Sequence, residues 1–216
     1  MLKFTLDLPD QQLRLLCIGA HSDDLEIGCG GTVLAWLAAY ENIEVTWVIL
    51  SAPGRRKAEA RDSANELLKG ANRVNLVLRD FRDGHLPAHF SEAKSLFEEL
   101  KAGEIPDVIL THRLEDRHQD HRLIAELTWQ TFRDHLILEY EIPKYEGDLG
   151  QPNLFVPLSA SVCKRKVEHL INHFGSQRSK SWFTEDTFTS LMRIRGIESN
   201  APELFAEAFY FRKLLI

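Results

Sequence analysis

The strongest constraint on the fold is the alternation of short apolar runs with segments that carry a helical pattern. Apolar runs occupy 13–19 and 44–51, the second of them rich in β-branched residues, and a helical pattern at 58–68 separates the second run from a third at 74–78. When strands and helices alternate in this way, each helix carries the chain back across the sheet, and the next strand pairs in parallel. The sequence therefore predicts an α/β protein with a mainly parallel sheet flanked by helices.

The alternation continues through the rest of the chain. Strands are expected at 108–111, 136–141, 154–157 and 206–211, and helices around 91–103, 123–127, 163–174 and 188–194. Ser91 stands where it would cap the first of these helices, and Gly103 where it would end it. A chain of 216 residues without repeats or a low-complexity linker suits one core of this type, so we expect residues 1–216 to form a single domain.

Composition argues against several classes of protein. The net charge is −6, whereas a nucleic-acid-binding face is basic. The sequence contains no run of about 18 apolar residues, so no transmembrane helix is predicted. Residues 1–13 are acidic and broken by proline, unlike a signal peptide, and three cysteines without paired spacing suggest a reducing compartment. We therefore expect a cytoplasmic protein that binds no nucleic acid and does not span a membrane, with homo-oligomerisation left open.

The stretch AHSDDLEIGCGGT at 20–32 follows the first predicted strand and leads into an apolar helical segment. Histidine and aspartate are ligands that zinc accepts, and one turn can aim His21 and Asp24 at a single point. Asp23 is left beside this pair as a candidate general base. The glycines at 28, 30 and 31 are expected to let the backbone approach the site closely and to adopt positive φ at the helix entry.

Two simpler interpretations compete with a metal site at 20–32. Aspartate and serine near a helix start often serve only as N-caps. A glycine cluster after a strand also occurs in phosphate-binding loops, but the spacing here is not G-x-G-x-x-G, and carboxylates stand where a phosphate would lie. Cys29 within the cluster is expected to be a small buried thiol rather than a metal ligand.

A second segment rich in histidine and aspartate, THRLEDRHQDHR at 111–122, also follows a predicted strand and precedes a helical pattern. Because the carboxyl ends of parallel strands meet at one edge of a sheet, the two segments are expected to converge there. The remaining histidines are expected at the surface: His85, His89, His135, His169 and His173.

The 20–32 stretch and the HQDH core at 118–121, taken together, resemble the PIG-L / LmbE-like family of zinc-dependent N-acetylglucosamine deacetylases. The segments RKAEARDSANELL (56–68), RDGHL (82–86) and AEAF (206–209) are also similar to the family pattern, so the resemblance touches nearly the whole chain. It implies a Rossmann-like three-layer sandwich with a metal site at the carboxyl ends of the strands. It also implies an enzyme that hydrolyses an amide.

Carried over residue by residue, the family's metal ligands fall on His21, Asp24 and His121, and its general base falls on Asp23. The implied cofactor is Zn²⁺, with Fe²⁺ as the alternative that the same donors accept. In the implied reaction the metal polarises the acetyl carbonyl and acidifies a water molecule. Asp23 removes the proton of that water, and the products are acetate and a free amino sugar.

Four further residues match family positions around the substrate. His118 corresponds to the histidine that, in protonated form, stabilises the oxyanion or protonates the leaving amine, and Asp120 to a residue that orients it. Arg56 and Asp83 match positions that contact the sugar or phosphate groups. Ser22 replaces the usual proline, which is expected to loosen the loop slightly. His112 and Asp116 lie outside the matched core and are expected to be outer partners of the ligands or solvated residues.

The resemblance implies a small-molecule partner, an N-acetylated amino sugar of the N-acetylglucosamine type, carried on a nucleotide, a lipid or a thiol conjugate. Two alternatives remain open from the sequence. One is an amidase of the same fold that acts on another amide conjugate, and the other is a non-catalytic module that binds metal or sugar. Without the family resemblance, Arg56 would be read as one charge on an exposed helix face, and Asp83-Gly84 as a plain turn.

Overall fold

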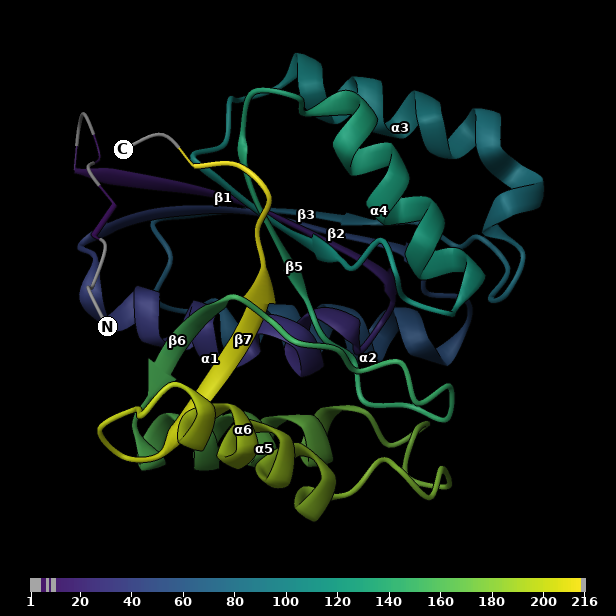
Figure 1. Ribbon diagram of the computed structural model, residues 1–216. Coiled ribbons are helices and arrows are strands. Elements are labelled where there is room, and N and C mark those ends of the chain that lie inside the picture. Colours follow the sequence, from purple (N-terminus) through teal and green to yellow (C-terminus); the bar gives the residue numbers. More distant parts are fainter. Residues whose placement is uncertain (1–4, 7, 9–10, 215–216) are drawn as a thin grey trace.

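A seven-stranded sheet forms the centre of the computed structural model, which describes residues 5–6, 8 and 11–214 (Figure 1). Its strands run in the order β3-β2-β1-β4-β5-β7-β6. The pairs from β3 to β5 are parallel, and β7 is antiparallel to both of its neighbours. The mainly parallel sheet of the sequence analysis is therefore confirmed. The bounds are β1 (Gln12–His21), β2 (Asn42–Ser51), β3 (Arg73–Leu78), β4 (Val108–His112), β5 (Leu136–Tyr140), β6 (Leu154–Leu158) and β7 (Phe205–Tyr210).

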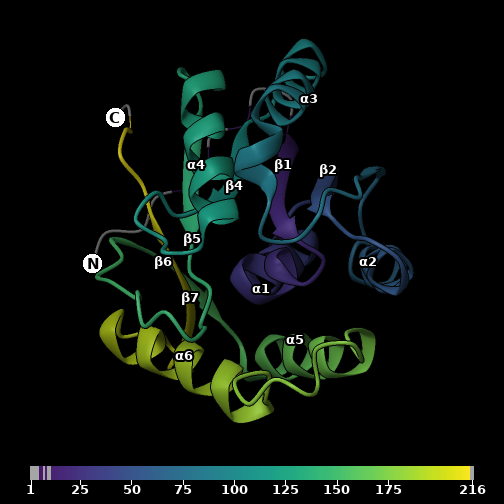
Figure 2. The same cartoon turned by 90° about the vertical axis from the view of Figure 1, so that its right-hand side faces the viewer.

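Helices cover both faces of this sheet, as expected for a three-layer α/β fold (Figures 1 and 2). Helices α3 and α4 lie on one face and α1 and α2 on the other. Helix α5 packs against α1 and α2, and α6 packs against β7. The bounds are α1 (Asp24–Ala39), α2 (Arg55–Leu67), α3 (Phe90–Ala102), α4 (Gln119–Thr131), α5 (Ala160–His173) and α6 (Glu185–Glu198), with a 3₁₀ turn at Leu86–His89.

Alternate residues of the central strands feed two separate hydrophobic cores. In β1, Leu15 and Cys17 join the core under α1, whereas Leu16 and Ile18 join the core under α3 and α4. Both faces are buried, which explains why the sequence shows continuous apolar runs there instead of alternation. None of the helices in the described part of the chain has the length and apolarity that crossing a bilayer requires.

Most predicted elements are present with shifted ends, but the predicted cap of the helix around 91–103 is wrong. Helix α3 begins one residue before Ser91, which therefore lies in its first turn, and the residue at the cap position is His89. The three cysteines are free and buried, in agreement with the expectation for Cys29. Part of the 1–13 segment, on which the absence of a signal peptide was predicted, lies outside the described residues.

The glycine cluster serves packing and not positive φ. Gly28, Gly30 and Gly31 all lie inside α1, and the glycines with positive φ are elsewhere, at Gly54, Gly84 and Gly147. A Cβ on Gly28 would lie 2.2 Å from the Tyr140 ring, and one on Gly31 would lie 2.7 Å from Leu158. Gly28 and Gly31 therefore let the sheet approach α1 closely. The close approach is a packing contact and not an approach to the site, and the predicted positive φ at the helix entry is wrong.

The topology places a crevice at the carboxyl ends of β1 and β4. These strands are neighbours, yet the chain leaves β1 toward β2 on one side and leaves β4 toward β5 on the other. Such a reversal of strand order opens a crevice in which α/β proteins bind ligands. Both segments rich in histidine and aspartate begin at this point, since His21 ends β1 and His112 ends β4.

Candidate functional site

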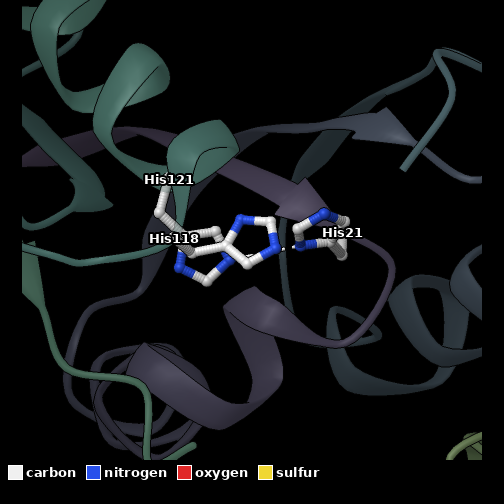
Figure 3. A group of neighbouring side chains, drawn as sticks. All are labelled: His21, His118 and His121. Atoms are coloured by element: carbon white, nitrogen blue, oxygen red, sulfur yellow. Dashed lines mark hydrogen bonds between the residues drawn. The ribbon is translucent and has the colours of Figure 1, made fainter. Parts of the chain in front are cut away.

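The two segments converge, as predicted. His21 comes from the end of β1, and His121 comes from the first turn of α4 (Figure 3). Nδ1 of His21 lies 3.2 Å from Nε2 of His121 and 3.3 Å from Oδ2 of Asp24. Nε2 of His121 and Oδ2 of Asp24 are 3.5 Å apart. All three residues are buried. Two histidine nitrogens and one carboxylate oxygen therefore form a compact triangle at the mouth of the crevice.

The dimensions of this triangle suit a divalent cation. Ligand atoms at about 2.0–2.1 Å from a tetrahedral zinc lie about 3.3 Å from one another. Two of the three donors, His121 and Asp24, also have the required protonation. Burial and the neighbouring His112 lower the pKa of His121 to about 3, which keeps its ring neutral. Burial alone would raise the pKa of Asp24, but His121, His112 and His21 outweigh it and hold that pKa well below its usual range.

Each histidine of the triangle is held at its other ring nitrogen. Nδ1 of His121 lies 2.9 Å from Oδ2 of Asp116, which in turn lies 3.0 Å from the ammonium of Lys144. On His21, Nε2 lies 3.2 Å from Oδ2 of Asp120 and 3.0 Å from Oδ1 of Asp83. Carboxylates that bond the outer nitrogen of a ligating histidine fix its tautomer and orientation.

Asp120 occupies a different position from the one that the sequence analysis expected. Its carboxylate lies against His21 and accepts hydrogen bonds from the backbone N–H groups of Gly84 and Leu86, at 2.7 and 3.1 Å. Toward His118 it presents only its backbone N–H, which donates to Nδ1 at 3.3 Å. Its side chain is therefore placed to orient His21, and its main chain to orient His118.

The ring of His21 carries a raised pKa in this arrangement. Burial opposes its protonation, but the carboxylates of Asp24, Asp120 and Asp83 outweigh burial and raise the pKa of His21 well above its usual value. A divalent cation would take the place of the proton that these carboxylates attract. The surplus of negative charge around His21 is thus a second feature that suits a cation.

Asp23 stands beside the triangle and not in it. It occupies the cap position of α1 but makes no side-chain capping bond, so the simple N-cap interpretation does not describe it. Its carboxylate lies 3.6 Å from Nη2 of Arg56. Burial and the neighbouring Asp24 raise the pKa of Asp23, with Arg56 and Lys180 acting in the opposite direction. A raised pKa brings a carboxylate closer to the range that suits a general base.

His118 lies next to the ligand triangle, with its ring 4.9 Å from that of His21 and 4.6 Å from that of His121 (Figure 3). Burial and the nearby His21 lower the pKa of His118, so this ring is the neutral form and not the expected imidazolium. Because Nδ1 accepts the Asp120 N–H, the proton of the neutral ring belongs on Nε2. That nitrogen is left as a hydrogen-bond donor.

Arg56 and Asp83 form the rim of the site. They are joined at 2.7 Å, and the side chain of Asp83 is 46% exposed whereas that of Arg56 is 16% exposed. Nε of Arg56 also donates to the hydroxyl of Ser22 at 3.1 Å. The serine that replaces proline thus gives Arg56 a partner, a role that the sequence analysis did not foresee.

His112 and Asp116 belong to the interior of the site and are not solvated. His112 is fully buried and stacks on His121, with ring centroids 3.9 Å apart. Its Nε2 accepts the N–H of Ala20 at 2.9 Å and lies 3.1 Å from Asp24, so it is already engaged. Among the described residues, His112 and His118 are the other histidines close enough to join a metal.

The sequence did not predict the buried polar contacts of two side chains, Lys144 and His169. Lys144 comes from an irregular loop whose sequence gives no indication that it folds back on Asp116. His169, expected at the surface, is buried in α5 and lies 2.8 Å from the hydroxyl of Ser63 in α2. His169 lies on the buried side of α5, three residues after Lys166 and off the apolar stripe itself, so the stripe did not indicate its burial.

Comparison with known proteins gives this geometry a context. Residues 16–132, more than half of the chain, match the family model PIG-L, described as GlcNAc-PI de-N-acetylase. A curated relative, an uncharacterized deacetylase named YaiS from Escherichia coli (strain K12), is 28% identical over 148 residues, which cover 64% of this chain and 78% of the relative.

Three solved structures share the fold over nearly the whole chain. The conserved protein TT1542 from Thermus thermophilus has a TM-score of 0.70 at 18% identity, covering 95% of this chain and 97% of its own. The 4-carboxy-2-hydroxymuconate hydratase GalB from Pseudomonas putida has 0.69 at 16% identity, covering 95% and 98%. N,N'-diacetylchitobiose deacetylase from Pyrococcus horikoshii has 0.67 at 17% identity, covering 92% and 83%. Since these neighbours include a hydratase and a deacetylase, the fold alone does not specify the reaction.

Proposed function

The chain belongs to the PIG-L family of deacetylases, and from this premise we propose that it is a metal-dependent hydrolase that removes the acetyl group from an N-acetylated amino sugar. The observation that carries the proposal is the triangle of His21 Nδ1, Asp24 Oδ2 and His121 Nε2, with edges of 3.2–3.5 Å. It lies beside a buried carboxylate of raised pKa, Asp23.

The three atoms of the triangle are proposed to hold zinc, or ferrous iron, which accepts the same donors. A divalent cation held there would polarise the amide carbonyl and make a water molecule more acidic. The outer bonds of Asp116 to His121 and of Asp120 to His21 keep the two imidazoles oriented toward the cation.

Asp23 is proposed to act as the general base. Its carboxylate takes the proton of the attacking water and then, as a carboxylic acid, returns it to the departing amine. Arg56, at 3.6 Å, opposes the rise in the pKa of Asp23 that burial and Asp24 cause. His118 is proposed to donate a hydrogen bond from Nε2–H to the carbonyl oxygen, whose negative charge grows as the tetrahedral intermediate forms.

Arg56 and Asp83 are proposed to bind the sugar and its substituent. The pair stands at the rim and offers a cationic fork and a half-exposed carboxylate, which suit the hydroxyl and phosphate groups of a glycan. Substrates of the N-acetylglucosamine type on a nucleotide, lipid or thiol conjugate remain the proposed class.

The proposal is tested by measuring acetate release from N-acetylglucosamine carried on phosphate, nucleotide, lipid and thiol groups, with the metal content measured in the same preparations. We expect acetate release from at least one conjugate, loss of bound metal in His121→Ala, and no change in Asp62→Asn, an exposed carboxylate on α2. A protein that takes up no divalent ion, or one that binds it and releases no acetate from any conjugate, would contradict the proposal.

A further inference from the structure

All the candidate ligands among the described residues lie between positions 21 and 121, which leaves the contribution of α5, α6, β6 and β7 to be explained. A buried ion pair in this part of the molecule indicates one. Nζ of Lys166 in α5 lies 2.6 Å from Oε1 of Glu207 in β7, and both side chains are only 4% exposed.

This pair attaches to the backbone of α1. Oε1 of Glu207 accepts the N–H of Gly31 at 2.8 Å, and Oε2 accepts the N–H of Thr32 at 2.6 Å. The ammonium of Lys166 donates to the carbonyl of Ile27 at 2.5 Å. One ion pair thus binds a carbonyl and two N–H groups of α1 that lie about one turn apart. The glycine at position 31 leaves room for the Glu207 carboxylate.

A second polar connection reaches the first turn of α1 from the same helix. The hydroxyl of Ser63 donates to the carboxylate of Glu26 and lies 2.8 Å from Nε2 of His169. His169 and Lys166 are three residues apart and therefore lie on one side of α5. Helix α5, which lies against α1 (Figure 2), touches α1 at Ile27 and reaches it through Ser63 at Glu26.

We propose that Lys166 and Glu207 are positioning residues of the metal site: they fix the axial position and rotation of α1, and thereby keep Asp23 and Asp24 at the distances from His21 and His121 that the reaction needs. The inference rests on the proposed metal site. A buried ion pair adds little to stability that an apolar pair could not supply. Its directional bonds to Ile27, Gly31 and Thr32 provide what an apolar pair cannot, because a displacement of about 1 Å is enough to disable such a site.

The test separates positioning from stability by removing the pair as a unit. In Lys166→Met/Glu207→Met no buried charge is left unpaired, so the melting temperature should stay close to that of the wild type, whereas Glu207→Gln alone should lower it. We expect the double variant to bind zinc about 10–100-fold more weakly, measured by competition with a chromophoric chelator, and to lose kcat while KM stays unchanged.

The matched control is the other buried ion pair of this region, Arg195 with Glu141, at 2.7 Å. It lines the same cavity as Lys166 and Glu207. Its other partners are the half-exposed carboxylate of Glu198, the carbonyl of Gly150 and the hydroxyl of Tyr210, and none of them lies in α1. Arg195→Met/Glu141→Met should change the melting temperature to a similar degree and leave zinc affinity unchanged.

The outcomes are distinguishable. Unchanged zinc affinity in Lys166→Met/Glu207→Met, or equal losses in both double variants, would overturn the inference, since the second result indicates general loosening. If the wild type itself binds no divalent ion, the proposed function has failed. A loss of zinc affinity in Lys166→Met/Glu207→Met, without a loss in Arg195→Met/Glu141→Met, supports the positioning role.

Discussion

The chain divides into two regions that contribute differently to the site. Residues 16–132 supply the proposed base and all the candidate metal ligands found in the described part of the chain. Residues 133–214 supply side chains that contact those residues from the outer side. Tyr140 packs against Gly28, Lys144 bonds Asp116, and Lys166 bonds Ile27. The candidate chemical groups of this site and the side chains that support them therefore come from separate parts of the sequence. Variants in one region, or at a contact between the two, should separate these contributions.

The largest effect is expected from Asp23→Asn, which removes the proposed base and leaves the contacts from residues 133–214 unchanged. Because general base catalysis contributes about 10²–10⁴-fold, kcat should fall by that factor while zinc content, measured by atomic absorption, stays at the wild-type level. Asp62→Asn serves as the matched carboxylate control. Full activity in Asp23→Asn would remove Asp23 from the mechanism.

Gly28→Ala tests the contact between α1 and β5. The added methyl group would lie 2.2 Å from the Tyr140 ring, and overpacking of this kind costs up to about 3 kcal/mol. Gly30→Ala is the control, because a Cβ there has no neighbour closer than 3.8 Å. It should stabilise the helix by about 0.5–1 kcal/mol. Urea denaturation of both variants measures the difference, and equal stabilities would contradict the packing role of Gly28.

The pH dependence of stability probes the contact between α5 and α2. Burial and the stacked His173 lower the pKa of His169 to about 4, compared with about 6.5 in an unfolded chain. Between these values the unfolded state binds a proton that the folded state does not. His169 therefore costs no stability above pH 6.5, and stability is lost as the pH falls toward 4, by about 3 kcal/mol. The free-energy difference between wild type and His169→Gln should shrink over that window, and parallel curves would argue against the buried neutral histidine.

The smallest effect is expected where Lys144 meets Asp116. Asp116→Asn keeps an acceptor for Nδ1 of His121 but loses the charge, so zinc affinity should fall by about 10-fold. Asp148→Asn removes the other partner of Lys144, at 2.7 Å, without touching His121, and should change the affinity less. Chelator competition measures both, and the reverse order would show that the loop and not Asp116 orients the histidine.

Local patterns predicted much of the fold and of the ligand set. The strands of the parallel half and the helices between them follow from the alternation of apolar runs with helical patterns, and the position of His21 follows from the end of the first strand. The convergence of His121 with His21 could be expected because both segments leave neighbouring strands at one edge. The assignment of roles to these residues required the family resemblance and stays a prediction.

Long-range partners could not be predicted in the same way. Nothing in a single sequence pairs Glu207 with the N–H groups of α1, or Asp120 with His21 and not with His118. Lys166 offered one indication, because it stands among Cys163, Val167 and Leu170 on the apolar side of α5. A charge on a buried stripe requires a buried partner, but the identity of that partner is a property of the tertiary structure.

The placement of β7 between β5 and β6 has a consequence for the order of events during synthesis on the ribosome. Strand β6 is synthesised before α5 and α6, but its hydrogen-bonding partner, β7, is made only after both of these helices. Glu207 belongs to that late strand, and α1, made among the first elements, receives its two backbone bonds from it. The histidines and aspartates of the site are therefore synthesised long before the Lys166–Glu207 ion pair, which is proposed to align them, can form.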